Sequence, residues 1–364
     1  MIQLPFREDV YVENIVYDPN GKYFLAGDIG GTNTNFGIFR LDSQPVLLFS
    51  IHYKSQDITD FPQVVNTVCQ YVQENYKITL NIGCFGAAGI VKENHQYSQP
   101  TNLPWPLSVP DIKRASCLKE LILINDFEAV GYGIDFLSSD KFAVINTGIE
   151  HAKSNKACIG AGTGLGKALM RWSSSYKKYV TIPTEGGHAD FVVHNQNELE
   201  LVKFIQKDLQ MPCNVSWEHV LSGKGIQRIY KFLIILKKYP KNEYTAEIEA
   251  YDFNPDRISF YAQKDELCRE TFLWYSKFYA RCAKNYTLDT LALAGIYIGG
   301  GIAAKNLPIF QEPHFLNEFR LCGKYSKLLS TIPIYIILDY NVSLYGALGA
   351  YNYYQSEMMR NGRN

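Results

Sequence analysis

The stretch FLAGDIGGTNTNFGIFR, residues 24–40, contains an apolar run that ends in Asp28, a glycine turn, and a second apolar run. Residues 23–27 and 35–41 have the composition of strands, and a third strand-like run, PVLLFSIHY, occupies 45–53 after the turn DSQP. These runs predict a meander of three strands. Its first turn is either an ordinary hairpin or a backbone cradle for a phosphate group, and the stretch alone is compatible with both.

The length and charge of the chain restrict its class. Its 364 residues are too many for one ordinary core and suit two domains. The 36 basic and 36 acidic residues cancel, whereas a nucleic-acid binder usually carries a basic excess. The first residues, MIQLPFREDVYVEN, lack the apolar centre of a signal peptide, and the apolar segment 288–304 is too short and glycine-broken to span a membrane. We expect a soluble, cytoplasmic protein that binds neither nucleic acid nor a membrane.

The cysteines give no sign of a metal site. None of the eight forms a CxxC pair, and the seven histidines show no HExxH spacing. Scattered cysteines of this kind are typically reduced, buried and inert. We expect this of all eight: Cys69, Cys84, Cys117, Cys158, Cys213, Cys268, Cys282 and Cys322.

The second half of the chain repeats the opening pattern, since KACIGAGTGLGKALMRW at 156–172 also reads as strand, glycine turn and strand. Such a repeat implies two similar α/β domains that face one another, with a ligand in the cleft. Residues 1–22 look polar and irregular. Helices are predicted, from apolar periodicity and composition, at 60–76, 196–209, 222–238 and 262–285, and at 341–355, where small residues allow close packing.

Three glycine turns follow strand-like runs: GDIGGTN at 27–33, GAGTGLG at 160–166 and GGG at 299–301. Their spacing fits neither the P-loop nor a GxGxxG turn that opens a helix, so a phosphate cradle here would be built from hairpins. Asp28, at a strand end, could hold Mg²⁺ through water beside the phosphates. The candidate nucleotide-binding residues are Asp28, Gly30, Gly31, Thr32, Asn33, Gly162, Thr163, Gly164, Gly299, Gly300 and Gly301.

Polar side chains at other strand ends suit a hydroxyl-rich substrate. Phosphoryl transfer to an alcohol needs a carboxylate that takes the hydroxyl proton, and amide, carboxylate and imidazole groups bind sugar hydroxyls. Several candidates also have a purely structural interpretation: Asp126 as a helix N-cap, His188 as a structural turn residue, and Glu218 as a solvated helix residue. The candidates are Asn102, Asn125, Asp126, Glu185, His188 and Glu218.

Eight motifs in order carry a family resemblance: GDIGGTN, PTNLPW, LINDFEA, GAGTGLG, EGGHADF, VLSGKG, IGGGIA and IPIYIILDYNVSLYGALGAY. Over residues 23–355 the chain resembles bacterial-type glucokinases, of the group A hexokinase-like family within the actin/hexokinase/Hsp70 ATPase fold. The resemblance implies an α/β fold with two similar actin-like, ribonuclease H-like domains and a ligand cleft between them. One domain would comprise 1–136 with 341–364, and the larger one 137–340.

The resemblance also implies roles for individual residues. Asp126 matches the catalytic base, Asn125, Glu185, His188 and Glu218 match sugar ligands, and Asn102 falls in a segment that lines the sugar cleft. GDIGGTN and GAGTGLG match the two phosphate loops, with Asp28 near Mg²⁺, and 299–301 matches the adenosine motif. The chain departs from the family at Thr184, where glycine is frequent, and in the loop GAAGIV, where a proline is frequent. It also lacks the zinc-binding cysteine motif of the ROK (repressor/ORF/kinase) branch.

The implied activity is an ATP-dependent glucokinase that uses Mg²⁺ and forms glucose 6-phosphate, the first step of glycolysis. The family also allows a homodimer. Two alternatives stay open: a kinase for mannose or an amino sugar, and a sugar-sensing regulator without catalysis. ADP and polyphosphate stay open as phosphoryl donors. Two features argue against the regulator: Asp126 is present, and no helix-turn-helix pattern precedes residue 23.

Overall fold

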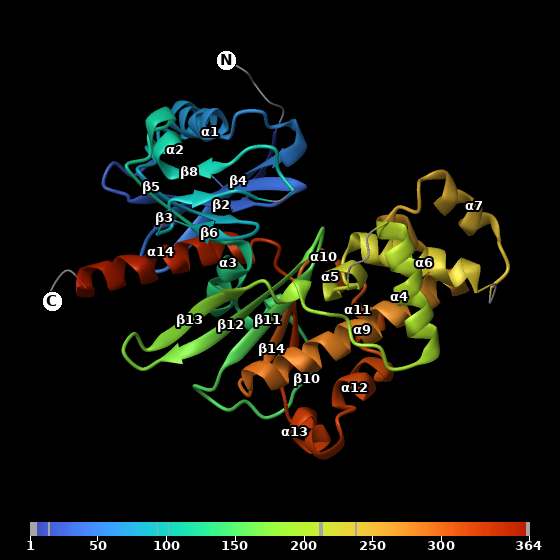
Figure 1. Ribbon diagram of the computed structural model, residues 1–364. Helices are drawn as coiled ribbons and strands as arrows, with labels where there is room; N and C mark the ends of the chain where they lie inside the picture. Colours follow the sequence, from blue (N-terminus) through green and yellow to red (C-terminus); the bar gives the residue numbers. More distant parts are fainter. Residues whose placement is uncertain are drawn as a thin grey trace. The chain divides into compact units, whose positions relative to one another are not determined.

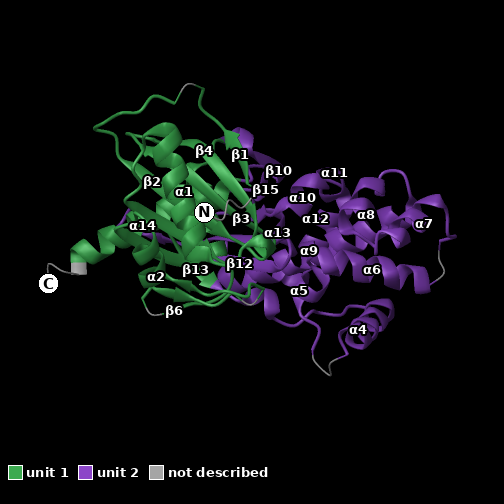
Figure 2. Ribbon diagram, turned by 90° about the horizontal axis from the view of Figure 1, so that it is seen from above, with its two compact units in different colours: residues 1–138, 178–183, 341–364 green, residues 139–177, 184–340 purple. Residues whose placement is uncertain are grey.

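The computed structural model describes residues 6–13, 15–92, 94–100, 102–210, 214–236 and 239–361. Contacts divide the chain into two compact units, which are coloured separately in Figure 2. Unit 1 comprises Met1–Ser138, Lys178–Pro183 and Asn341–Asn364, and unit 2 comprises Ser139–Lys177 and Thr184–Tyr340. Both are α/β, as the sequence predicts.

Unit 1 is built on a six-stranded sheet of order β1-β4-β3-β2-β5-β9. The predicted meander is confirmed, because β2, β3 and β4 pair antiparallel, whereas β5 and β9 continue the sheet parallel to β2. The strands are β1 (Arg7–Val10), β2 (Tyr23–Ile29), β3 (Asn33–Leu41), β4 (Pro45–Lys54), β5 (Ile82–Ala87) and β9 (Glu120–Asn125). The prediction that 1–22 is irregular is wrong at 7–10, since β1 pairs with β4 and covers its edge.

Helices cover both faces of this sheet (Figure 1). Successive strand residues point to opposite faces, so Leu25 packs in the core beneath α1 whereas the Phe24 ring contacts Tyr351 of α14. The predicted first helix is confirmed, and its N-cap Asp60 accepts a hydrogen bond from the Gln63 amide. The helices are α1 (Phe61–Tyr76) and α2 (Val109–Ala115) on one face, and α3 (Asp126–Gly133) and α14 (Val342–Asn361) on the other.

Helices α3 and α14 cross in backbone contact, as the small residues of 341–355 predict. A Cβ atom built on Gly346 would lie 1.6 Å from the Ala129 carbonyl oxygen, and one on Gly133 would lie 1.9 Å from the Val342 carbonyl oxygen. Neither carbonyl can move without displacing its helix. The crossing matters for the site because α3 begins at Asp126.

Gly346→Ala is therefore expected to lower the free energy of unfolding by about 3 kcal/mol, since the added methyl group forces the two helices apart. Urea unfolding of the whole chain measures the loss. Gly349→Ala is the matched control, because its nearest neighbour is the Phe136 ring at 2.9 Å, a side chain that can turn aside. Equal losses in the two variants would contradict the prediction.

The second six-stranded sheet has the order β10-β15-β14-β11-β12-β13, and its strands belong to unit 2 except β13, of which Lys178–Pro183 is grouped with unit 1. Here β11 and β12 form an antiparallel hairpin, and β14 and β15 continue parallel to β11. The pattern repeats that of β2, β3, β5 and β9, so the predicted internal repeat is confirmed. The strands are β10 (Phe142–Asn146), β11 (Lys156–Ala161), β12 (Leu165–Ser173), β13 (Lys178–Thr184), β14 (Ile296–Gly299) and β15 (Ile334–Ile337).

Several helices of unit 2 pack against α9 (Glu266–Thr290), whose buried aromatic side chains form much of the second core. The helix predicted at 196–209 is confirmed. The helix predicted at 222–238 spans 223–235, and residues 237 and 238 lie outside the described ranges. The helix predicted at 262–285 is shifted to 266–290. The helices are α4 (Gln196–Leu209), α5 (Trp217–Val220), α6 (Gly223–Ile235), α7 (Glu243–Ala250), α8 (Pro255–Tyr261), α9 (Glu266–Thr290), α10 (Gly301–Lys305), α11 (Leu307–Phe310), α12 (Pro313–Arg320) and α13 (Ser326–Ser330).

Short elements complete the chain. Single turns of 3₁₀ helix are η1 (Ser55–Asp57), η2 (Ile134–Phe136), η3 (Ser139–Lys141), η4 (Gly186–His188) and η5 (Gly323–Tyr325). A small sheet joins β6 (Val91–Lys92), β7 (Tyr97–Ser98) and β8 (Leu107–Ser108). Within the ranges described, none of the helices is long and apolar enough to cross a bilayer.

Candidate functional site

The first glycine turn joins β2 to β3 and is fixed from outside by η1. The Ser55 hydroxyl donates to the Gly30 carbonyl at 2.6 Å, and the Ser55 amide donates to the Thr32 carbonyl at 3.0 Å. The Gln56 side chain donates to the Gly31 carbonyl at 3.0 Å. Because these three carbonyls are held from one side, the turn is rigid without any ligand.

Asn102 lies directly against this turn. A Cβ atom on Gly31 would come within 2.9 Å of the Asn102 Cβ, so only glycine lets the two segments approach. The loop PTNLPW, from which the sequence alone indicated no more than a loop, is therefore placed beside Gly31. Thr101 of that loop lies outside the described residues.

Asp28 lies two residues before the turn, opposite Asn35 in the hairpin. Its carboxylate accepts a hydrogen bond from the Ser343 hydroxyl of α14 at 2.8 Å. Burial raises the pKa of Asp28, and the hydrogen bonds from Ser343 and Asn35 oppose that shift. Among the described residues, no three His, Cys, Asp or Glu side chains gather as a ready-made metal cage. A single carboxylate fits Mg²⁺ nonetheless, since that ion keeps several waters and takes its other ligands from substrate phosphates.

Asp126 follows β9 and begins α3, but it is not the N-cap. The N-cap is Asn125, whose side-chain oxygen accepts from the amides of Phe127 at 2.9 Å and Glu128 at 3.1 Å. Asn125 also donates from Nδ2 to the Gly89 carbonyl at 3.0 Å. The interpretation of Asp126 as the helix N-cap is therefore wrong, because the neighbouring Asn125 caps the helix.

Glu128 closes the same cap from a buried position. Its carboxylate lies 3.4 Å from the Asn125 amide and accepts from the Tyr354 hydroxyl of α14 at 2.6 Å. The His95 ring lies against Tyr354, with 4.2 Å between ring centroids. Through these contacts α14 supports the turn that carries Asp126, just as it supports Asp28 through Ser343.

Burial raises the pKa of Glu128 to about 7 from an ordinary value of 4.5. The folded chain then keeps a proton that the unfolded chain has released, so the corresponding stability is present below pH 4.5 and lost as the pH rises towards 7. Glu128→Gln keeps the cap but cannot ionise. Relative to this variant, the free energy of unfolding of the wild type should fall by about 2–3 kcal/mol between pH 4.5 and pH 7. Urea unfolding of both chains as a function of pH measures the difference. A difference that does not change with pH would contradict the assignment.

The second and third glycine turns lie together in unit 2. Gly300 has a φ of 85°, and a Cβ atom on it would lie 2.3 Å from the Ala161 carbonyl oxygen at the end of β11. The turn after β11 is closed by the Gly162 amide, which donates to the Gly164 carbonyl at 2.9 Å. A Cβ atom on Gly162 would meet nothing within 4 Å, so that side of the turn is open, and Thr163 next to it is exposed.

Glu185, His188 and Glu218 converge beside this turn. His188 lies between the two carboxylates, with its Nε2 3.9 Å from Glu185 and its Nδ1 4.0 Å from Glu218. Glu218 also accepts from the Leu165 amide at 2.9 Å, which fixes it to the start of β12. The His188 side chain is 61% exposed, that of Glu185 47% and that of Glu218 31%, so all three can meet a ligand from solvent.

The structure thus gathers the predicted residues into two groups, one in each unit. In unit 1, β5 separates Asp28 from Asn125 within one sheet, and both lie at the end where the parallel strands finish. In unit 2, the turn at 162–164 lies next to Glu218, and Gly300 lies next to Ala161, where that turn begins. The prediction missed the supporting residues Ser55, Gln56, Asn35, Ser343, Glu128 and Tyr354. Only Glu128 had a sequence signal, the N-x-x-E spacing of a capping box.

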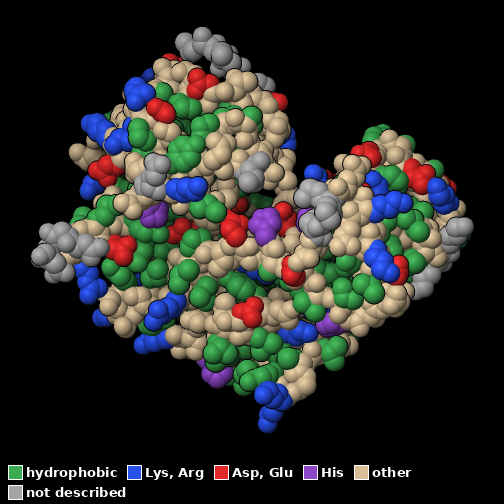
Figure 3. Space-filling view, in the orientation of Figure 1, with side chains coloured by type: hydrophobic (Ala, Val, Ile, Leu, Met, Phe, Trp, Pro, Cys, Tyr) green, Lys and Arg blue, Asp and Glu red, His purple; other side chains and the backbone are tan. Residues whose placement is uncertain are grey.

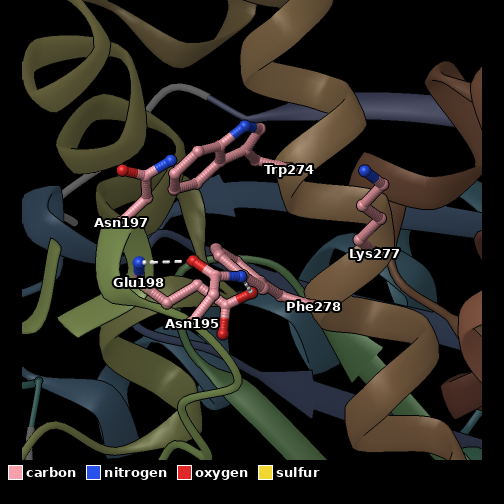
Figure 4. Close-up of a pocket in the computed structure, with 6 residues that line it drawn as sticks. All are labelled: Asn195, Asn197, Glu198, Trp274, Lys277 and Phe278. Atoms are coloured by element: carbon pink, nitrogen blue, oxygen red, sulfur yellow. Dashed lines mark hydrogen bonds between the residues drawn. The ribbon is translucent and has the colours of Figure 1, made fainter. Parts of the chain in front are cut away.

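A cavity of about 150 Å³ in unit 2 contains none of these residues. Figure 4 shows that Asn195, the N-cap of α4, and Glu198 of α4 lie opposite the α9 side chains Trp274, Lys277 and Phe278. The main charged group of the cavity is already used, because Glu198 pairs with the buried Arg281 at 2.7 Å and accepts hydrogen bonds from the His194 amide and the Asn195 side chain. We assign this cavity a structural role.

The face shown in Figure 3 carries acidic and basic side chains interspersed with apolar ones. Lys and Arg side chains are scattered over it and do not form a continuous stripe. This agrees with the balanced composition of the chain.

The fold is that of sugar kinases. A crystal structure of glucokinase from an Antarctic psychrotroph superposes with a TM-score of 0.73 at 27% identity, covering 90% of this chain and 98% of that one. The glucose complex of Balamuthia mandrillaris glucokinase superposes with a TM-score of 0.77, covering 90% of this chain and 93% of that one. At 20% identity this similarity is one of fold.

Sequence comparison narrows the class to one family. Residues 25–353 match the glucokinase family. The glucokinase of Nostoc punctiforme is 35% identical over 89% of this chain and 97% of its own length, and that of a Synechocystis strain is 32% identical over 90% and 97%. The chain belongs to the glucokinase family.

Proposed function

We propose that this chain transfers the γ-phosphoryl group of ATP to the 6-hydroxyl of D-glucose and releases glucose 6-phosphate. The observation that carries the proposal is that each unit contains a group of residues suited to one part of this reaction. One is a carboxylate, Asp126, at a strand end beside a rigid glycine hairpin, and the other is an exposed histidine between two carboxylates beside a second hairpin. Membership of the glucokinase family supports it.

In unit 1 we assign the proton transfer to Asp126. A carboxylate accepts the proton of the 6-hydroxyl as the oxygen attacks phosphorus, and the Asn125 cap holds the backbone that carries it. Asn125 uses its oxygen and one amide hydrogen internally, so we assign its second amide hydrogen to a sugar hydroxyl. Asn102, which lies beside Gly31, would bind the sugar from the neighbouring loop.

In unit 2 we assign sugar binding to Glu185, His188 and Glu218. A carboxylate accepts from vicinal hydroxyls, and an imidazole both donates and accepts. Glu218 keeps Oε1 for a ligand while Oε2 holds the Leu165 amide. These residues would determine the sugar specificity, and a mannose or amino-sugar kinase would differ from a glucokinase mainly at these positions.

The three glycine turns would hold the nucleotide. We assign phosphate binding to backbone amides of the turns at 30–33 and 162–164 other than those of Gly30 and Gly162, which close the turns, and 299–301 would lie along the adenosine. A Streptomyces griseus ROK glucokinase, similar in fold, was crystallised with glucose and AMPPNP, which supports ATP as donor. Asp28 would hold Mg²⁺ through water, and the ion would neutralise charge on the transferred phosphoryl group. We also propose the non-zinc branch, because the sequence lacks the zinc-binding cysteine motif of the ROK branch.

A coupled assay with a panel of sugars and donors tests the proposal. Among the sugars glucose, mannose and glucosamine, we expect the highest kcat/KM with glucose. Among the donors ATP, ADP and polyphosphate, we expect it with ATP. Higher kcat/KM for another sugar would move the assignment to that hexose. Sugar binding without turnover of any of them would favour a sugar-sensing regulator instead.

Replacing Glu185 with alanine should raise the KM for glucose by about 10- to 100-fold and change kcat much less, because a hydrogen bond to a charged group contributes about 1.5–3 kcal/mol. Steady-state kinetics measures both constants. Glu200→Ala, on the exposed face of α4, is the control and should leave the KM unchanged. A Glu185→Ala enzyme with the wild-type KM would remove this residue from the sugar site.

A further inference from the structure

A row of polar side chains crosses the first sheet from Asp28 towards the edge that β1 covers. Its members are direct partners on neighbouring strands: Asp28 of β2 pairs with Asn35 of β3, and Asn35 pairs with His52 of β4. Direct partners in an antiparallel pair have Cβ atoms about 4.5–5.5 Å apart on the same face of the sheet. The three side chains are therefore close enough to act together, and all of them belong to unit 1.

The His52 ring is held at both of its nitrogens. Its Nδ1 lies 2.8 Å from the Asn35 Oδ1, and its Nε2 lies 2.7 Å from the Ser50 hydroxyl. The Tyr11 hydroxyl in turn lies 2.9 Å from the Ser50 hydroxyl. A second acceptor for Tyr11, the Asn341 oxygen, is more distant at 3.4 Å. The side chain of His52 is only 18% exposed, so these contacts fix the ring.

The hydrogen on Nδ1 decides which way the Asn35 amide is turned. Oδ1 of Asn35 can accept from His52 only if Nδ1 carries hydrogen, and Nδ2 of Asn35 is then left to donate to Asp28. A hydrogen bond from Asn35 to Asp28 opposes the rise in the pKa of Asp28 that burial causes. With hydrogen on Nε2 alone, the amide would turn over and present its oxygen to the Asp28 carboxylate, where the two would repel each other.

Asp9 of β1 competes for this hydrogen. Its carboxylate lies 3.2 Å from the His52 Nε2 and pairs with Arg7 at 2.8 Å. Burial and the charge of Arg7 lower the pKa of His52, and Asp9 opposes the shift, so the ring is neutral at neutral pH. Asp9 favours hydrogen on Nε2, whereas the Ser50 hydroxyl can donate to Nε2 and leave the hydrogen on Nδ1. A doubly protonated ring would satisfy Asp9 and still keep hydrogen on Nδ1.

We propose that His52 is a positioning residue for Asp28. Hydrogen on its Nδ1 fixes the Asn35 amide, so that Nδ2 donates to the Asp28 carboxylate. On the other side of the ring, Ser50 donates to Nε2 and Tyr11 donates to Ser50. Every donor in the row points towards Asp28, and hydrogen bonds in series strengthen one another. This inference rests on the proposed function, in which Asp28 holds the water shell of Mg²⁺.

The row gives the first strand a role beyond covering an edge. β1 and Tyr11 precede residue 25, where the match to the glucokinase family begins. The Tyr11 amide donates to the Leu48 carbonyl of β4 at 2.9 Å, which holds the tyrosine beside the row. Groups that orient a ligand of a metal influence how well the metal is held. Through Tyr11 the segment before residue 25 would thus contribute to the use of MgATP.

The first test locates the hydrogen and does not depend on catalysis. Nitrogen-15 NMR of the histidine-labelled full chain, without ligand at neutral pH, should show hydrogen on Nδ1 of His52. His52→Asn identifies the signals of this ring among those of the seven histidines. In Asn35→Ala, where Nδ1 has lost its acceptor, the hydrogen should move to Nε2, towards Asp9. Hydrogen on Nε2 alone in the wild type would overturn the proposal.

The second test measures the effect on Mg²⁺. His52→Leu removes the donor and keeps a side chain of similar bulk. The Mg²⁺ concentration for half-maximal rate should rise by about 3- to 10-fold, less than the 10- to 100-fold typical of groups that contact a metal ligand directly. The KM for glucose should not change. Calorimetric titration with MgATP in the absence of sugar should show a matching loss of affinity without any turnover.

Two variants separate positioning from damage to the fold. His52→Asn keeps an N–H donor near the place of Nδ1 and should recover most of the loss. His151→Leu replaces an exposed histidine of unit 2 and should behave as the wild type. Equal losses in His52→Asn and His52→Leu would contradict the proposal, because the donor would then be irrelevant. If His52→Leu does not fold, the NMR measurement on the wild type decides.

The same titrations distinguish this inference from the proposed function. Normal use of MgATP by Asp28→Ala would refute the role proposed for Asp28, and with it any positioning by His52. A loss in Asp28→Ala without any loss in His52→Leu would refute the positioning role alone.

Discussion

Replacing Asp126 with alanine should lower kcat for glucose phosphorylation by about 10²- to 10⁴-fold, the range that a general base contributes. The affinity for glucose should stay within a few-fold, because the sugar ligands proposed in unit 2 are untouched. The cap of α3 should also survive, since Asn125 forms it and Asp126 does not. Coupled-assay kinetics gives kcat, and calorimetric titration with glucose gives the affinity.

Two controls separate chemistry from damage to the fold. Asp126→Asn keeps the shape and removes the base, so it should lose nearly as much turnover as alanine. Asp111→Ala removes an exposed carboxylate from α2 in the same unit and should cost nothing. Wild-type turnover in Asp126→Ala would refute the assignment of the base.

Asp28→Ala should impair the use of MgATP by roughly 10²-fold in kcat/KM, while glucose affinity changes little. The carboxylate would hold the water shell of Mg²⁺, and its removal leaves the phosphate charge less neutralised. Measuring rates across a range of Mg²⁺ concentrations at fixed ATP tests this. The variant should need more Mg²⁺ for half-maximal rate.

Ser343→Ala is the matched control for Asp28, because it removes the same 2.8 Å hydrogen bond and keeps the charge. It should lower stability more than activity. If Ser343→Ala and Asp28→Ala reduce the use of MgATP equally, the effect of Asp28 is structural. Weaker glucose binding in Asp28→Ala with normal use of MgATP would also contradict the proposal.

Local patterns in the sequence predicted the parts of the fold that depend on local physics. Apolar periodicity located α1, including its buried Val64, Val68 and Val72, and glycine-bounded apolar runs located the two hairpins. The small residues of α14 predicted a close helix crossing, which the structure shows at Gly346. The proposed site residues were found because each glycine turn and polar pair follows a strand.

The rest depended on contacts between distant segments. Arg7–Val10 is a strand only because the edge of β4 lies beside it, and four-residue patterns carry too little periodicity to show this. Ser343 lies within the predicted helix 341–355, where nothing in the local pattern marks it as a partner of Asp28, and the contact between the two spans 315 residues. The burial of cysteines also depends on the whole fold, and the expectation that all are buried is wrong for Cys117, which is exposed in the turn between α2 and β9.

The dependence of Asp28 and Glu128 on α14 has a consequence for how the protein is made. Val342 leaves the ribosome 204 residues after Ser138, which at 5–20 residues per second is roughly 10–40 s later. Until then the nascent first sheet presents an uncovered apolar face around Phe24 and Phe39, whose final neighbours are Tyr351 and Tyr345. During synthesis the half-built kinase would therefore be a natural client for chaperones, and it would gain its catalytic turn only when α14 arrives.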